Sequence, residues 1–289
     1  MTPGNTPKNS SPTVDCYIDC WEGTYRELLA PGVLGERFAA HRYPFACRVL
    51  TINNTDDTAM ALHLANAAVT RGDCDEYVVV ADALPRALAR CGLEARDLGR
   101  VFYFNNFLLV TVATATADYI LHVAGDVYLE RPFDWITDAV TTLQANPRFF
   151  AANPDLVDHP GLSEQTALWF EDPYWINRSF SDQCFLGATA RYAVPIYKEW
   201  NEASNRYPMS SVGRIFEARV DAYMQNRELY RMTDSRIRYK HISHDTPGET
   251  YVKPYVWQRA VTLVKYRLPR AGRKLAAAAR SRRDHAAMR

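Results

Sequence analysis

The sequence predicts an α/β protein built on a mostly parallel, Rossmann-type sheet flanked by helices. Short apolar runs alternate with segments of helical periodicity through the first half of the chain, which is the order that produces a parallel sheet. Polar residues follow the apolar runs directly, as they do where buried strands reach a sheet edge. With 289 residues and 47% hydrophobic content, the chain can bury a large core.

The first half provides five expected strands and three expected helices. The strands are apolar and rich in β-branched or aromatic residues, and we expect them at Val14–Cys20, Arg48–Asn53, Tyr77–Ala81, Val101–Phe104 and Tyr119–Val123. Helical patterns fill the spaces between them at Asp57–Thr70, Leu84–Cys91 and Phe107–Thr116. The last of these is rich in β-branched residues, which have lower helix propensity.

The second half is less regular. A helix is expected at Trp135–Gln144, followed by a loop-rich stretch that reaches Ser181. Two further helices at Val194–Ser204 and Val212–Asn226 precede a short last strand at Ile237–Ile242.

The two ends of the chain differ from its body in composition. Residues 1–12 are rich in Pro, Ser, Asn and Thr and lack the apolar stretch of a secretory signal, so we expect a disordered lead-in and a cytoplasmic protein. No apolar run reaches the roughly 18 residues that a membrane span requires. The six cysteines form no Cys-x-x-Cys pair, which favours reduced, buried thiols over a disulfide framework or a zinc site.

The net charge of +1 hides a strong asymmetry. Residues from Lys253 onward carry a balance of +10, whereas the chain before them carries −9. A basic helical tail at 251–289 predicts a polyanionic neighbour, and an anionic membrane surface fits better than nucleic acid because the body is acidic.

One motif carries most of the chemistry. The strand Tyr119–Val123 leads into Ala124-Gly125-Asp126, which presents a carboxylate at the carboxyl edge of the sheet. This stretch resembles the metal-binding strand of family-2-type glycosyltransferases with the GT-A fold, which usually carry an Asp-any-Asp triplet. The resemblance implies a catalytic domain at residues 13–250, with a nucleotide-binding half at 13–131 and an acceptor half at 132–250.

Only the last acid of that triplet is kept, because Ala124 occupies the first position. The resemblance implies that Gly125 and Asp126 contact the diphosphate and a divalent cation, Mn²⁺ or Mg²⁺, whose other ligands come from the donor. The missing acid indicates either a weakened metal site or transfer with little dependence on metal.

The resemblance also places a nucleotide donor at the ends of the first two strands. Asp19, Trp21 and Glu22 follow the first strand, in the place where the family holds the base and ribose. Asn53, Asn54 and Asp56 resemble the family's Asp-Asn-Gly-Ser-Thr-Asp turn, and Asn105 belongs to an Asn-rich turn before the metal strand. Asp56, with Thr55 as a competitor, is also a plausible helix cap, and an ordinary helix start would account for Asn105.

Candidates for catalysis lie in the second half. By resemblance Glu217, on a predicted helix, is the first choice of general base, and Asp182 at the start of an apolar run is the second. His241 and His244 lie at the end of the last strand, where by resemblance one imidazole would contact the metal or diphosphate. A surface position for Glu217 and solvated histidines are the plain alternatives.

Aromatic residues beside carboxylates suggest an acceptor wall, since sugars present apolar faces to rings. The side chains concerned are Trp169, Tyr174, Trp175 and Gln183. Core packing is the alternative role for any single ring.

The resemblance implies transfer of a sugar from a nucleoside diphosphate sugar to a hydroxyl of a glycan, lipid-linked or small-molecule acceptor, with inversion. Two alternatives remain open. A sugar-1-phosphate nucleotidyltransferase has a related sheet, but it needs a Gly-rich basic loop that residues 21–25 do not provide. A catalytically inactive sugar-binding homologue would account for the missing acid.

The tail supplies the first testable prediction. Trp257, Tyr266 and surrounding basic residues suit a helix at the headgroup level of an anionic leaflet, where each basic residue adds on the order of 1 kcal/mol. We expect the full chain to sediment with vesicles that contain acidic lipid and a chain ending at Pro254 to stay in solution. Equal sedimentation of the two forms, or none by either, would contradict membrane contact through the tail.

Overall fold

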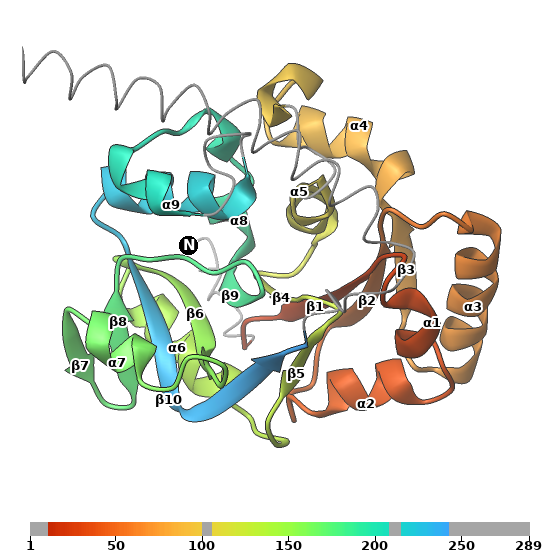
Figure 1. Ribbon diagram of the computed structural model, residues 1–289, viewed down its shortest axis with the longest axis horizontal. Helices are drawn as coiled ribbons and strands as arrows, with labels where there is room; N and C mark the ends of the chain where they lie inside the picture. Colours follow the sequence, from red (N-terminus) through yellow and green to blue (C-terminus); the bar gives the residue numbers. More distant parts are fainter. Residues whose placement is uncertain (1–10, 100–105, 208–214, 243–289) are drawn as a thin grey trace, which may run out of the picture.

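The computed structural model describes residues 11–99, 106–207 and 215–242. These residues form an open ten-stranded sheet with the strand order β3-β2-β1-β4-β9-β6-β10-β8-β7, and β5 pairs with β10 beside this path. Figure 1 shows the sheet crossing the molecule from β3 at the right to β7 at the left, with helices on both sides. The predicted α/β class is therefore confirmed.

The first half matches the expected alternation. Its strands are β1 (Val14–Cys20), β2 (Cys47–Ile52), β3 (Glu76–Val79), β4 (Tyr119–Val123) and β5 (Val127–Leu129). Its helices are α1 (Tyr25–Leu28), α2 (Val33–Ala39), α3 (Thr58–Arg71), α4 (Val80–Arg90), the 3₁₀ helix η1 (Ala95–Leu98) and α5 (Asn106–Thr114). Strands β3, β2, β1 and β4 pair in parallel, so their carboxyl ends meet at one edge.

The second half makes the sheet mixed. Its strands are β6 (Phe149–Leu156), β7 (Trp169–Glu171), β8 (Tyr174–Asn177), β9 (Cys184–Ala188) and β10 (Tyr230–His241). Its helices are α6 (Ile136–Ala145), α7 (Leu162–Thr166), α8 (Thr189–Tyr192), η3 (Ile196–Lys198), η4 (Glu202–Arg206) and α9 (Phe216–Asn226). Strand β9 runs antiparallel to β4, whereas β10 runs parallel to β6 and antiparallel to β5 and β8.

Alternating side chains of the central strands build a separate core on each face of the sheet. Cys16 and Ile18 of β1 join a core with α2, α3 and α6, whereas Tyr17 joins the opposite core with α4, α5 and α9. Successive residues of a strand point to opposite faces, and both faces here are covered by helices. This double burial explains why β1 reads as a continuous apolar run, and it stabilises α5 despite its β-branched residues.

Some expectations differ from the structure. The short last strand expected at Ile237–Ile242 is the end of a longer strand, β10, which begins at Tyr230 and ends at His241. The helix expected at Val194–Ser204 is two separate 3₁₀ helices, because the side chain of Asn201 accepts the N–H of Ala203 and starts a new turn there. The loop-rich stretch before Ser181 contains three strands whose polar and proline residues hide their pattern. The third strand ends at Val79, where α4 begins.

Several expectations lie outside the described residues. These are the strand at Val101–Phe104, the lead-in up to residue 10, Asn105, His244 and the basic tail at 251–289. No helix in the described ranges combines the length and apolarity of a bilayer crossing. All six cysteines are free thiols, as predicted, and all except Cys47 are buried.

Candidate active site

The carboxyl ends of β1 and β2 place the first predicted donor loops side by side. The backbone N–H of Glu22 donates to the carbonyl of Asn54 (3.2 Å), and its carboxylate accepts the N–H of Asp56 (2.8 Å). Asn53 is buried at the end of β2, and its N–H donates to the carbonyl of Cys20. Trp21 lies over Gly23, where an added Cβ would come within 2.3 Å of the indole ring.

Asp56 does not cap the following helix, and neither does Thr55. The side chain of Asp57 accepts the N–H of Met60 (3.0 Å) and is the N-cap of α3. The carboxylate of Asp56 is exposed instead, and the turn of which it is part begins at Asn54 with a positive φ of 49°.

Asp19 is buried near the carboxyl end of β1 and faces His122 of β4, with 3.7 Å between Oδ1 and Nε2. Burial, with the negative charge of Asp126 as a second cause, raises the pKa of Asp19 to about 8. Burial between the rings of Phe107 and Phe185 lowers the pKa of His122 to about 3. At neutral pH both groups are uncharged, so this contact is not an ion pair.

Asp126 occupies the turn between β4 and β5. Its Oδ2 lies 3.2 Å from Nε2 of His241, and its carbonyl accepts the N–H of Ile242 (2.8 Å). The hydrogen bond to Asp126 raises the pKa of His241 above its usual value. The fold thus brings two of the expected metal ligands, Asp126 and His241, into contact, whereas their binding of a metal stays a prediction.

The two candidate bases belong to different elements, and their charges interact. The carbonyl of Gln183, one residue after Asp182, accepts the N–H of Ala124 (2.7 Å), which sets Asp182 beside the Asp126 turn. Glu217 is the second residue of α9, whose Phe216 packs on Phe185 of β9. Both carboxylates are partly buried.

Their electrostatics differ. Burial raises the pKa of Asp182 to about 6, with the His241 cation acting in the opposite direction. Burial, followed by the charge of Asp182, raises the pKa of Glu217 well above its usual value, although Arg231 opposes the shift. Burial therefore favours the protonated form of both carboxyl groups, and their mutual repulsion adds to the shift of Glu217.

The predicted acceptor residues are not all brought to this place. Gln183 accepts a hydrogen bond from the hydroxyl of Tyr239 (3.0 Å) beside the site. Trp169 contacts Tyr230 at the start of β10, with 4.9 Å between ring centroids, whereas His241 is at the other end of that strand. Tyr174 is buried in the core and Trp175 packs on Phe170 in the β7–β8 hairpin.

A divalent cation fits the Asp126–His241 pair as a two-ligand site. The carboxylate oxygen and the imidazole nitrogen already lie within contact distance, and both are ligand types that Mn²⁺ accepts. Within the described ranges no group of three or more His, Cys, Asp or Glu side chains is arranged to hold a metal. The remaining ligands would have to come from a bound diphosphate, as the single acid of the motif implies.

Sequence patterns did not identify some residues of this site. His122 lies within an ordinary apolar strand, and Arg231 and Arg37 lie on elements without a motif. Arg37 reaches the Asp126 turn from α2, where it donates to the carbonyls of Gly125 and Val127. No spacing signal links this arginine to a turn about ninety residues away.

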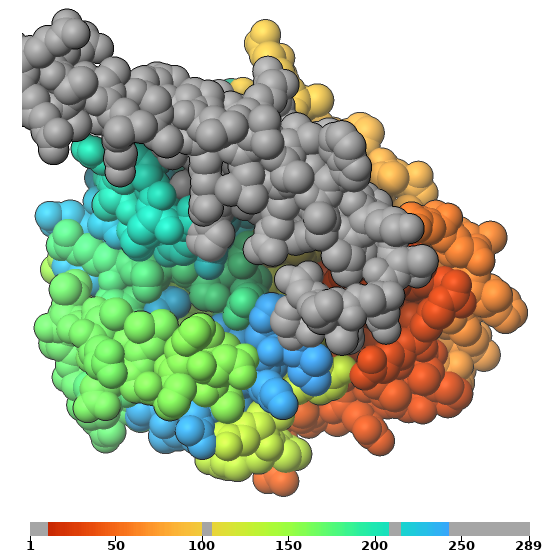
Figure 2. All heavy atoms as spheres, in the orientation of Figure 1, coloured from red at the N-terminus to blue at the C-terminus, as the bar shows by residue number. Residues whose placement is uncertain are grey.

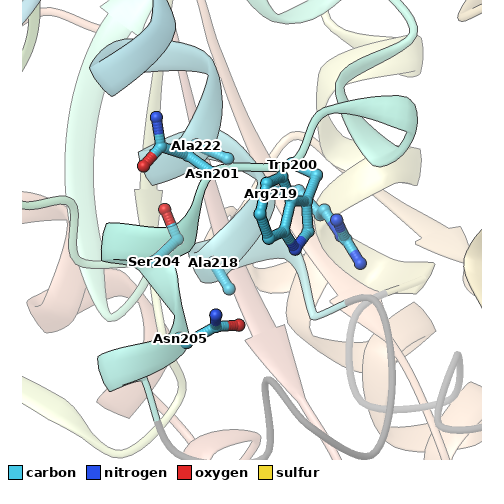
Figure 3. A pocket seen from close by; sticks show the side chains of 7 residues that line it. All are labelled: Trp200, Asn201, Ser204, Asn205, Ala218, Arg219 and Ala222. Atoms are coloured by element: carbon cyan, nitrogen blue, oxygen red, sulfur yellow. The ribbon is translucent and has the colours of Figure 1, made fainter.

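A separate shallow pocket opens between α9 and η4. Figure 3 shows Trp200 beside Arg219 at its rim, with Ala218 and Ala222 of α9 lining it. The carbonyl of Trp200 accepts a hydrogen bond from Asn226 (3.2 Å), which fixes the loop. None of the acids of the candidate site lines this pocket. Strand β10, which ends at His241, does not line this pocket. Its blue atoms lie between the red and the green parts of the chain in Figure 2.

No family model and no curated protein matches the sequence. Among solved structures, the chain is similar to the mannosyltransferase PcManGT from Pyrobaculum calidifontis in complex with GDP-Man and Mn²⁺ (13% identity, TM-score 0.48, 84% of this chain and 62% of that one). It is also similar to S. aureus TarS (14%, 0.44, 80% and 37%) and to glucosyl-3-phosphoglycerate synthase from Mycobacterium tuberculosis in complex with Mn²⁺, UDP and glucosyl-3-phosphoglycerate (13%, 0.37, 66% and 63%).

The chain spans less than two thirds of each of these three proteins. At such identities and TM-scores the similarities assign neither a reaction nor a substrate to this chain.

The buried Asp19 generates a prediction about stability. Its pKa is about 8 in the folded protein and about 3.9 in an unfolded chain, so the folded state binds more protons between these values. Its contribution to the free energy of unfolding is therefore complete below about pH 4 and is lost as the pH rises towards 8, by up to about 1.4 kcal/mol per unit. Asn cannot ionise, so Asp19→Asn should be increasingly more stable than the wild type from pH 5 to pH 8.

Urea unfolding at several pH values measures this difference. The exposed Asp56→Asn serves as the control and should follow the wild type. Parallel pH profiles for Asp19→Asn and the wild type would show that Asp19 ionises normally.

Proposed function

We propose that this protein transfers a sugar from a nucleoside diphosphate sugar to a hydroxyl acceptor. The observation that carries the proposal is the convergence of Asp19, Asp126, Asp182 and His241 at one sheet edge, with Glu217 of α9 close enough to Asp182 for their charges to interact. Such a site combines a place for a cation and its diphosphate with a carboxylate able to move a proton. Those are the two requirements of glycosyl transfer to an alcohol.

The donor would occupy the edge formed by the loops after β1 and β2. Asn53, Asn54 and the ring of Trp21 are there to contact the base and ribose, while Glu22 holds the two loops together. Asp126 and His241 would hold Mn²⁺ or Mg²⁺, which supplies positive charge to the departing diphosphate. Because the protein offers two ligands in the described part of the chain, metal affinity should depend strongly on the donor.

Asp182 is better suited than Glu217 to accept the proton of the acceptor hydroxyl. A general base works best with a pKa near the operating pH, and that of Asp182 is about 6. The pKa of Glu217 is raised well above its usual value, so its protonated form is favoured and would donate a hydrogen bond to the acceptor. The pKa of Asp182 therefore favours the second of the two expected bases, acting in a direct displacement that inverts the anomeric centre.

A catalytically inactive sugar-binding protein is the second candidate. It is favoured by the lack of a three-ligand metal cluster among the described residues and by Ala124 in place of an acid. Donor hydrolysis by the purified protein separates the two functions, because a binding module releases no nucleoside diphosphate. The basic tail, outside the described residues, would suit an acceptor at a membrane surface.

The donor site predicts a metal-dependent thermal shift. UDP or GDP with Mn²⁺ should raise the melting temperature, since a ligand at a hundred times its Kd stabilises by about 2.7 kcal/mol. Asp126→Ala should lose most of this shift and nearly all transfer, whereas Asp138→Ala, on α6, should keep both. Wild-type transfer by Asp126→Ala would refute the assignment of this turn.

The base assignment predicts an order of effects. Asp182→Asn should bind donor normally but lose transfer by on the order of a hundredfold or more, the usual worth of a positioned base. Glu217→Gln should lose less, because the amide still donates a hydrogen bond. The wild-type kcat/KM should rise with pH through about 6, as Asp182 ionises, and Asp182→Asn should lose that limb.

The reverse order of the two variants would make Glu217 the base. A product that keeps the donor's anomeric configuration would exclude inversion. Measuring transfer and product configuration in one assay decides both points.

A further inference from the structure

Arg37 is a buried cation beneath the turn that carries Asp126. It belongs to α2, and only 8% of its surface is exposed. Its Nη2 donates to the carbonyls of Gly125 (3.5 Å) and Val127, the residues on either side of Asp126. One guanidinium group thus contacts the backbone on both sides of the residue that carries the carboxylate.

A second contact fixes the plane of this guanidinium. Its Cζ lies 3.4 Å from the centroid of the Tyr128 ring, and the Tyr128 hydroxyl donates to Glu27 of α1 (3.2 Å). Stacking of this kind holds an arginine in one orientation. Arg37 is therefore connected to the turn by two carbonyls and to β5 by a ring.

Arg37 forms no ion pair within the described residues, although burying a cation is costly. Its Nη1 is also buried and has no hydrogen-bond partner among them. The nearby acids Asp126 and Glu27 attract it only at longer range. A methionine of similar length would fill the same space without this cost, so the charge and the fork-shaped donor group point to a functional role.

We propose that Arg37 is the positioning residue for Asp126, holding the turn so that its carboxylate meets the cation and diphosphate of the donor. This inference rests on the proposed role of Asp126. The first acid of the motif is replaced by Ala124, so it cannot help to hold the cation. The guanidinium of Arg37 instead keeps the turn, and with it the remaining acid, in a defined position. Lys would not replace Arg37, because its ammonium is one atom nearer to the backbone than Nη2 and has no planar group to stack on the Tyr128 ring.

Arg191 provides a matched control elsewhere in the fold. It also donates to two carbonyls, those of Phe149 (2.6 Å) and Pro147 (2.9 Å), and it lies over the ring of Phe150. It belongs to α8, which follows the end of β9 that is remote from Asp182. Arg191→Met thus removes the same kinds of contacts without touching the Asp126 turn.

The test is a Mn²⁺ titration of the UDP- or GDP-induced thermal shift, together with kcat and KM for the donor. Arg37→Met should weaken apparent Mn²⁺ affinity about 10- to 100-fold, the usual effect of losing a residue that orients a metal ligand. Arg37→Met should mainly raise the KM for the metal and the donor, with a smaller change in kcat. Arg37→Lys should restore little of the metal affinity. Arg191→Met should lower the ligand-free melting temperature but keep wild-type metal affinity.

Wild-type metal affinity and KM in Arg37→Met would overturn the inference, as would equal losses in Arg37→Met and Arg191→Met. If Arg37→Met does not fold, Tyr128→Leu replaces it, because this change removes the ring and leaves the arginine; it should shift metal affinity in the same direction. Asp126→Ala, measured in parallel, separates a failure of the proposed function from a failure of the role proposed for Arg37. An unaffected Asp126→Ala refutes the proposed function, whereas its loss combined with an unaffected Arg37→Met refutes only the role of Arg37.

Discussion

The close approach of the Asp126 turn to the end of β1 is the constraint on which the site depends. A Cβ at position 125 would lie 2.2 Å from the carbonyl oxygen of Asp19, so only glycine lets the two backbones meet. Strand β4 lies between β1, parallel to it, and β9, antiparallel to it. The ends of β1 and β4 therefore lie beside the beginning of β9. This arrangement brings together Asp19 at the end of β1, Asp126 after β4 and Asp182 before β9.

This convergence concentrates carboxylates in a partly buried space. The pKa values of Asp19, Asp182 and Glu217 are all raised, chiefly by burial and then by a neighbouring acid. Without a cation, protonation of these carboxyl groups reduces the repulsion between their negative charges. A bound divalent ion would favour the ionised forms, so donor binding and proton release should be linked.

The sequence was most informative where residues are buried on regular elements. Strands β1 and β4 were predicted to the residue, because a short, continuous apolar run between polar turns is typical of a strand buried on both faces. The position of Asp126 at a sheet edge was also predictable, since it follows a strand, and His241 was expected at the end of the last strand, where it lies. The roles of Asp182 and Glu217 remain predictions that transfer assays must test.

What the sequence did not reveal depends on long-range contacts. The sequence around Arg37 or His122 does not indicate which residues they contact in the fold. A buried histidine within an apolar run looks like any strand residue. The polar stretch from Asn153 to Pro154 hid β6, which is a strand because β10 pairs with it. The capping role of Asp57 was missed by one residue, within the ordinary uncertainty of a helix start.

Strand β10 has a consequence for the order of assembly. It is the last described strand in the chain, yet it lies inside the sheet, between β6 and β8, and it also pairs with β5. The parallel half has all its strands once the chain has been synthesised to Val123. The second half must wait for residues 230–241, about eighty positions after β6 begins. Until then β6 has an open edge, so a nascent or truncated chain would expose a strand that is prone to pair with another molecule.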